Sequence, residues 1–225
     1  MKVERVFRFS TSLVLPEATG LRAATLPQLL QLLREAPESC VYHHTHYFLL
    51  AHHYLKPQPT NDFAYWVTEV LGEQALGEQL ASIDPLEFVN LAELRAALLH
   101  AIETHIGIHP MAAMKFVAEG EEFFFIKAVH VVLPTRFSAA TLASFASALE
   151  QVSINSLYYH LFDARLRLGR KTNDFAEWAS AALGLPVLAE DLARFDLYSQ
   201  TLEGIRDKML ARVKIELQRP EVARA

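Results

Sequence analysis

The chain has 225 residues, of which 52% are hydrophobic and 21% charged, and its formal net charge is -5. This composition excludes a disordered chain, and the acidic balance argues against a nucleic-acid-binding protein. One cysteine, no apolar run long enough to span a bilayer and no signal-peptide core together predict a cytoplasmic protein that does not contact a membrane.

The first predicted element is a strand over 7–15. Side chains that favour a buried face alternate there with polar ones, as in a half-buried strand: Phe7, Phe9, Thr11, Leu13 and Leu15. Pro16 is expected to end this strand, because proline cannot donate to a β-ladder. A helix is predicted from Leu26, where Thr25 and Gln28 form a candidate capping box.

The rest of this half of the sequence is predicted to be helical. A Tyr–His segment over 40–55 contains no Asp, Glu, Lys or Arg. The helix after it begins at the sequence NDF, where Asn61 or Asp62 can cap the first turn, and Gly72 stands where a left-handed C-cap belongs. A shorter helix over 76–83 and a last helix over 91–105 follow.

The same order of elements then repeats. About half of the positions in 60–84 recur in 172–196, including NDFxxW and the following LG dipeptide. A continuously apolar strand is predicted over 123–133, and the last helix recurs near 201–217. We therefore predict two tandem copies, residues 1–118 and 119–225. Each is one strand followed by about five helices, in a helix-rich α+β fold whose copies dock with pseudo-twofold symmetry.

A histidine retained in both copies is the first candidate for chemistry. His44 aligns with His160, beside the apolar stripe of its helix, where a polar group needs a partner. Asp62 and Asp174, at the start of the following helix, are the expected partners. The pair is either a structural bond between two helices, which we favour, or a general base oriented by a carboxylate. Because no nucleophile or oxyanion donor is identifiable, we assign no catalytic residue and favour a non-catalytic protein over an enzyme.

Aromatic residues retained beside these pairs could form a binding pocket, although aromatic residues at helical spacing are usually core. The predicted binding residues are therefore the retained aromatic, histidine and aspartate side chains: Tyr42, His44, Asp62, Trp66, Tyr158, His160, Asp174 and Trp178.

A cluster of histidines in the first copy allows an alternative, a transition-metal site. His43, His46 and His53 could bind Zn or Fe together with a carboxylate, because imidazole suits both metals. The second copy holds Tyr159, Phe162 and Gly169 at the aligned positions. The favoured prediction is therefore no cofactor.

The combination of a Tyr–His segment, NDFxxW, LG and LA resembles a prokaryotic domain family of uncharacterised function, over 26–95 and again over 142–206. The resemblance implies no activity, substrate or cofactor. The positions that it emphasises are those of the Tyr–His and NDFxxW segments: His44, Asn61, Asp62, Phe63, Trp66, His160, Asn173, Asp174, Phe175 and Trp178.

Three functions follow from these observations, in the order in which we favour them. The first is a non-catalytic module that binds a protein partner or forms a homo-oligomer, with the His-rich helix near the interface, since positions charged in the second copy are apolar or aromatic there. The second is a metal-binding protein or metalloenzyme. The third is a small-molecule sensor with a pocket between the copies.

Overall fold

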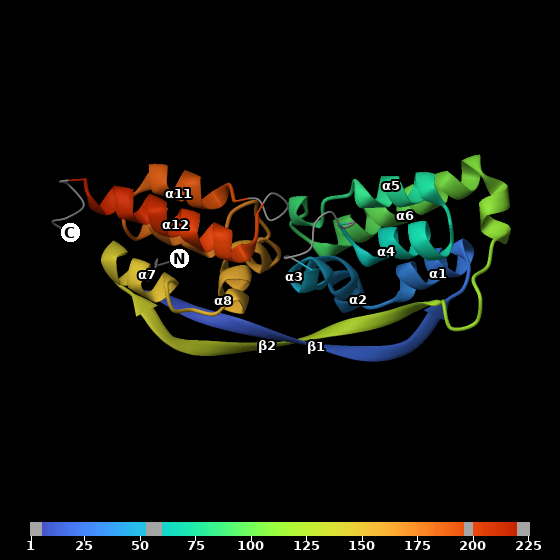
Figure 1. Cartoon of the computed structure of the whole chain (residues 1–225), viewed down its shortest axis with the longest axis horizontal. Helices are drawn as coiled ribbons and strands as arrows, with labels where there is room; N and C mark the ends of the chain where they lie inside the picture. The colour runs from blue at the N-terminus through green and yellow to red at the C-terminus, as the bar shows by residue number, and fades with distance from the viewer. Residues whose placement is uncertain (1–5, 53–59, 196–199, 220–225) are drawn as a thin grey trace. The chain divides into compact units, whose positions relative to one another are not determined.

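The computed structural model describes residues 6–52, 60–195 and 200–219. It confirms a helix-rich α+β fold in which a strand followed by helices occurs twice. The strands β1 (Phe7–Ala23) and β2 (Phe123–Ala139) form a two-stranded antiparallel sheet (Figure 1). Its register is marked by ion pairs between Glu17 and Lys127 and between Arg22 and Glu122.

The helices form two successive groups. Those between the strands are α1 (Leu26–Glu35), α2 (Glu38–Tyr42), α3 (Phe48–His52), α4 (Asp62–Tyr65), α5 (Gln74–Ala81) and α6 (Leu91–Ile108). Those after β2 are α7 (Leu142–Leu149), α8 (Ile154–Tyr158), α9 (Ala164–Leu168), α10 (Asp174–Ala181), α11 (Pro186–Ala193) and α12 (Leu202–Leu217). The predicted left-handed C-cap at Gly72 is confirmed by its φ angle of 72°, and Gly184, the aligned glycine of the second copy, has a φ angle of 67°.

Both strands continue beyond the predicted ends. β1 runs through Pro16 to Ala23, and β2 runs through Pro134 to Ala139. The prediction that proline ends each strand was wrong, because a two-stranded sheet leaves one edge of each strand open. At an open edge the missing N–H of proline removes no ladder hydrogen bond.

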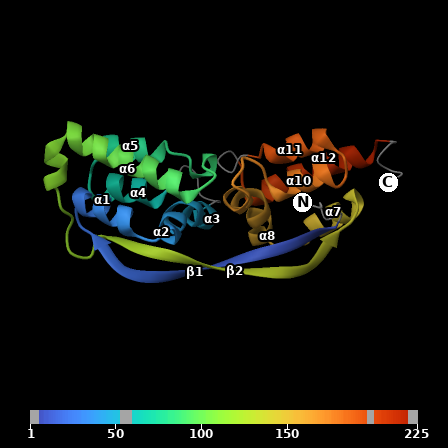
Figure 2. The same cartoon turned by 180° about the vertical axis from the view of Figure 1, so that it is seen from behind.

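The chain folds into two compact units, and each strand contributes to both. Unit 2 is Val14–His130, with α1 to α6; unit 1 combines the chain up to Leu13 with the chain from Val131, and holds α7 to α12. The units therefore differ from the predicted copies 1–118 and 119–225. Within each unit the helices cover one face of the strand pair (Figure 1 and Figure 2).

In unit 1, the helices of the second copy pack on the first strand of the first copy. Phe7 and Phe9 are buried against Phe145, Phe175 and Trp178, with ring centroids between 5.2 and 6.1 Å apart. The first half of β1 therefore belongs to the core of the second copy's helices.

Unit 2 has the reciprocal arrangement. Phe123 and Phe125 of β2 are buried beside Phe63, at centroid distances of 4.9 and 6.5 Å, and Phe123 also contacts Trp66. Phe123 and Phe125 align with Phe7 and Phe9 of the first copy. Each set of helices thus takes its aromatic strand from the other sequence copy.

The buried face of β1 changes along the strand. Phe7 and Phe9 are buried as predicted, but Leu13 and Leu15 are 45% and 46% exposed, whereas Val14 is buried. The predicted single buried face from Phe7 to Leu15 is therefore wrong. The change falls where the strand leaves the core of unit 1 and enters that of unit 2.

Candidate functional site

Each retained histidine lies in a short π-helical run inside the Tyr–His helix. His44 is in His43–Tyr47, between α2 and α3, and His160 is in Tyr159–Asp163, between α8 and α9. Both side chains are buried. Because π-helical turns frequently occur at functional sites, the partners of these two imidazoles decide how they can act.

The predicted His–Asp pairing is present in both units. The Nδ1 atom of His44 lies 2.8 Å from Oδ2 of Asp62, and Nδ1 of His160 lies 2.6 Å from Oδ2 of Asp174. Asn61 and Asn173, just before these acids, cap the same helices by accepting from the N–H groups of Ala64 and Ala176, each at 2.9 Å. The NDF sequence therefore fixes a cap and presents a carboxylate to the histidine.

The second ring nitrogen of each histidine is bonded to a strand. The amide of Ile126 donates to Nε2 of His44 at 3.0 Å, and the amide of Ser10 donates to Nε2 of His160 at 2.8 Å. An Nε2 atom that accepts must be unprotonated, so Nδ1 carries the hydrogen and donates it to the aspartate.

This hydrogen bonding limits what the two histidines can do chemically. A general base needs a free lone pair within reach of a substrate proton, and the lone pair on Nε2 already accepts a backbone amide. Each ring therefore links the N-terminus of a helix, through the imidazole, to the backbone of a strand. For the His–Asp pair, the geometry favours a structural bond over a general base.

Asp174, the carboxylate of the second pair, also forms an ion pair with Arg167. Burial by itself would raise the pKa of Asp174, but hydrogen bonds from His160 and Arg167, together with the charge of Arg167, bring that pKa below its ordinary value. Asp174 is 14% exposed at its side chain, compared with 34% for Asp62. The carboxylate of the second pair therefore depends more on its protein partners than that of the first.

The aromatic residues predicted to bind a ligand lie inside the units. Tyr42, Trp66, Tyr158 and Trp178 are all buried. The indole N–H of Trp66 donates to the carbonyl oxygen of Glu121 at 2.7 Å, and the ring of Tyr42 stacks on that of His46. The structure thus places these rings among core contacts, and a ligand for them remains a prediction.

The three histidines of the metal alternative are only partly described. His53 lies outside the described residues. His46 is buried, with Nδ1 at 3.1 Å from the hydroxyl of Thr45, and the ring of His43 stands edge-on to that of His44. Within residues 6–52, 60–195 and 200–219, no group of three or more His, Cys, Asp or Glu side chains is placed to hold one metal ion. The metal site therefore remains a prediction that rests on the sequence.

His43 is a buried histidine whose charged form is disfavoured in the folded protein. Burial, together with neighbouring His44, lowers the pKa of His43 from 6.5 to about 4, and Asp62 opposes the change. Its Nδ1 atom is buried and has no hydrogen-bond partner among the residues that the structure describes. Below pH 6.5 His43 is therefore protonated in the unfolded chain, whereas in the folded chain it is protonated only near pH 4 and below.

We expect His43 to make the protein less stable as the pH falls from 6.5 to 4. The free energy of unfolding contributed by this group is complete above pH 6.5 and declines by as much as about 3 kcal/mol across that interval. In His43→Tyr, which introduces the residue aligned in the second copy, this decline disappears. Urea unfolding of both proteins at pH 7 and pH 4.5 measures it, and equal losses of stability in the two proteins would contradict it.

Buried His105 belongs to a hydrogen-bonded chain with Glu73 and Lys115 that the sequence did not reveal. Nε2 of His105 lies 2.8 Å from Oε2 of Glu73, whose other oxygen pairs with Lys115 at 2.7 Å. Burial would raise the pKa of Glu73, but the hydrogen bonds from Lys115 and His105 lower it below its ordinary value. The signal in the sequence was an HxxxH pair, His105 and His109, whose rings lie 4.8 Å apart.

Comparison with known proteins shows the family. The chain belongs to a family of unknown function (DUF5752), whose model matches residues 4–214. It is also similar to the solved structure of OrfY from Thermoproteus tenax, with 30% sequence identity, a TM-score of 0.78 and coverage of 93% of this chain and 94% of that one. No curated protein matches the chain. In the part of the chain that the structure describes, no helix is both long and apolar enough to cross a membrane.

Proposed function

We propose that this protein is a non-catalytic module that associates with a second copy of itself. The observation that carries the proposal is a segment of unit 2 in which large apolar side chains face solvent, here called the Met–Phe segment: Ile108, Met111, Met114 and Phe116, exposed to between 66% and 79%. Exposed apolar side chains grouped in this way mark interaction surfaces on soluble domains.

The Met–Phe segment is held in place by residues that alternate with the exposed ones. Ala112 and Val117 are buried, and the amide of Val117 donates to the carbonyl oxygen of Ala24 at 3.0 Å. Lys115 forms an ion pair with Glu73. The segment therefore offers its apolar side chains from an ordered backbone, which lowers the entropic cost of binding.

A second copy of the chain suits this segment for two reasons. Its four exposed side chains are uncharged, so two acidic chains can meet there without like-charge repulsion, and methionine adapts its shape to an irregular surface. The residues given after α12, QRPEVARA, include no methionine or aromatic residue. One self-complementary patch per chain gives a closed dimer rather than a filament.

The His-rich helix is a less suitable interface than the sequence predicted. From Val41 to Leu50 every side chain except that of Tyr47 is buried within the chain. Of the three positions that are charged in the second copy, Leu49 is buried within the chain, whereas Tyr47 and Ala51 are half-buried.

The mass of the particle in solution tests self-association. We expect the protein to have twice the 25.4 kDa mass of one chain, and a triple variant, Met111→Gln, Met114→Gln and Phe116→Gln, to have the mass of one chain. Val187→Gln is the matched control, because Val187 is an exposed apolar residue of α11 in unit 1. Sedimentation equilibrium over a wide concentration range measures the masses. A wild-type monomer at every concentration, or a triple variant that stays dimeric, would overturn the proposal.

A further inference from the structure

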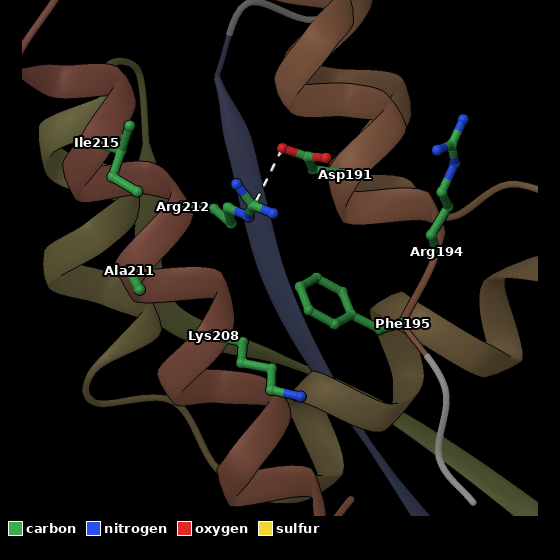
Figure 3. Close-up of a pocket in the computed structure, with 7 residues that line it drawn as sticks. All are labelled: Asp191, Arg194, Phe195, Lys208, Ala211, Arg212 and Ile215. Carbon is green, nitrogen blue, oxygen red and sulfur yellow. Dashed lines mark ion pairs between the residues drawn. The ribbon is translucent and has the colours of Figure 1, made fainter. Parts of the chain in front are cut away.

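A groove in unit 1 gathers positive charge around an aromatic ring. It lies between α11 and α12, has a volume of about 490 Å³ and is lined by Asp191, Arg194, Phe195, Lys208, Ala211, Arg212 and Ile215 (Figure 3). Pockets that bind small molecules measure roughly 300–1,000 Å³. The groove is thus large enough for a small ligand.

The cations of the groove are only weakly engaged by the protein. Arg212 reaches Asp191 at 3.7 Å, Arg194 reaches Glu190 at 3.4 Å, and Lys208 forms no ion pair with a described residue. In Figure 3, Lys208 and Arg212 extend from α12 on either side of the ring of Phe195. Among the described lining residues, three cations stand against one acid, in a chain whose net charge is -5.

The first sequence copy provides an internal comparison. The last helices of the copies align Lys208 with Ala97 and Arg212 with Ala101, and Arg194 aligns with Ser82. The corresponding helices α5 and α6 pack together in unit 2 without any of these charges. The cations are therefore not required for packing two such helices.

The geometry points to a nucleoside phosphate as the ligand of this groove. Lys208 and Arg212 would bind the phosphate, because ammonium and guanidinium groups form charge-assisted hydrogen bonds to phosphate oxygens. The ring of Phe195 would stack on the base, and the carboxylate of Asp191 would accept from a base amino group or a ribose hydroxyl. A nucleic-acid polymer fits less well, because it requires a basic stripe rather than one cationic groove.

Calorimetric titration with adenosine 5′-monophosphate tests this assignment. The decisive variant is Lys208→Ala with Arg212→Ala, which introduces the alanines found at both aligned positions of the first copy and so is expected to fold. We expect its affinity for the nucleotide to fall by about tenfold or more. Lys214→Ala is the control, because Lys214 is an exposed lysine of the same helix that pairs with Glu150 outside the groove.

Two further titrations separate the phosphate from the base. Inorganic phosphate should bind more weakly than the nucleotide. The variant Phe195→Ile introduces the aligned residue, Ile83; it should lower the affinity for the nucleotide and leave the affinity for inorganic phosphate unchanged. Equal affinity for both ligands, an unchanged double variant, or preference for an acidic peptide such as polyglutamate would overturn the assignment. Because the groove lies in unit 1 and the Met–Phe segment in unit 2, this result is independent of the dimer test.

Discussion

Replacing Phe9 with alanine is expected to destabilise the helices of the second sequence copy, although Phe9 belongs to the first. Its ring is 1% exposed and lies 5.7 Å from Phe145 and 5.9 Å from Phe175. Removing a buried phenyl group from a packed core costs about 3–5 kcal/mol, because it forfeits the apolar burial and leaves a cavity. We expect that loss in unit 1.

The two tryptophans of the chain make the location of this loss measurable, because each unit contains one. Trp178 contacts Phe7 in unit 1, and Trp66 contacts Phe123 in unit 2. In a Trp66→Phe background the remaining fluorescence reports unit 1, and in a Trp178→Phe background it reports unit 2. Phe9→Ala should lower the unfolding midpoint seen by Trp178 more than that seen by Trp66.

The reciprocal variant completes the test. Phe125→Ala should act mainly on the transition that Trp66 reports, because Phe125 is buried in unit 2. Leu13→Ala is the control on the same strand as Phe9; Leu13 is 45% exposed, so we expect a loss below about 1 kcal/mol. If Phe9→Ala shifted the Trp66 transition more than the Trp178 transition, the exchange of strands between the copies would be wrong.

This exchange marks the boundary of what the sequence could predict about the fold. Strand alternation, the NDF cap and the glycine C-caps are local patterns, and the helices that they define are present. The partner of a strand is a non-local choice. The sequence of β1 contains Phe7 and Phe9 but no information on which of two similar helix groups they contact, so the compact units could not be derived from the repeat.

The candidate site was predicted in part for the same reason. His44 and Asp62 are 18 residues apart on consecutive helices, and the repeat drew attention to both. The second partner of each imidazole, a strand amide 82 or 150 residues away, could not be inferred. That amide occupies the Nε2 lone pair that a general base would need, so the contact that bears most on the chemistry of the site is the one that the sequence could not provide.

The Met–Phe segment and the basic groove were missed for a different reason. Met111, Met114 and Phe116 read as ordinary hydrophobic residues, and Lys208 and Arg212 read as the charges of a solvated amphipathic helix. Exposure of the first set and convergence of the second depend on the folded surface. A comparison of the two copies position by position would have indicated both, since each set occurs in one copy only.

Replacing His160 with alanine is expected to lower the free energy of unfolding by about 3–4 kcal/mol. The variant leaves the Ser10 amide without its acceptor, which costs roughly 1–3 kcal/mol, and removes the ring that packs on Phe7 and Phe9. Asp174 keeps its bond to Arg167, so its carboxylate is not left alone. Guanidinium unfolding monitored at Trp178 measures the loss.

Two isosteric variants separate the two bonds of this imidazole. The amide oxygen of glutamine stands near the position of Nε2, so His160→Gln can still accept from Ser10 but loses the bond to Asp174. The amide nitrogen of asparagine stands near the position of Nδ1, so His160→Asn keeps the hydrogen bond to Asp174 but leaves the Ser10 amide without an acceptor. We expect glutamine to be the milder change, because Asp174 retains Arg167 whereas a strand amide facing the core has no substitute partner.

The same pair of variants at His44 tests whether the link to the strand is general. Asp62 lacks an arginine among its described partners but is more exposed than Asp174, so water can replace the imidazole there. Glutamine should again be better tolerated than asparagine. If asparagine were the milder change at both positions, the His–Asp bond would outweigh the bond to the strand, and an accessible Nε2 lone pair would return general-base catalysis to consideration.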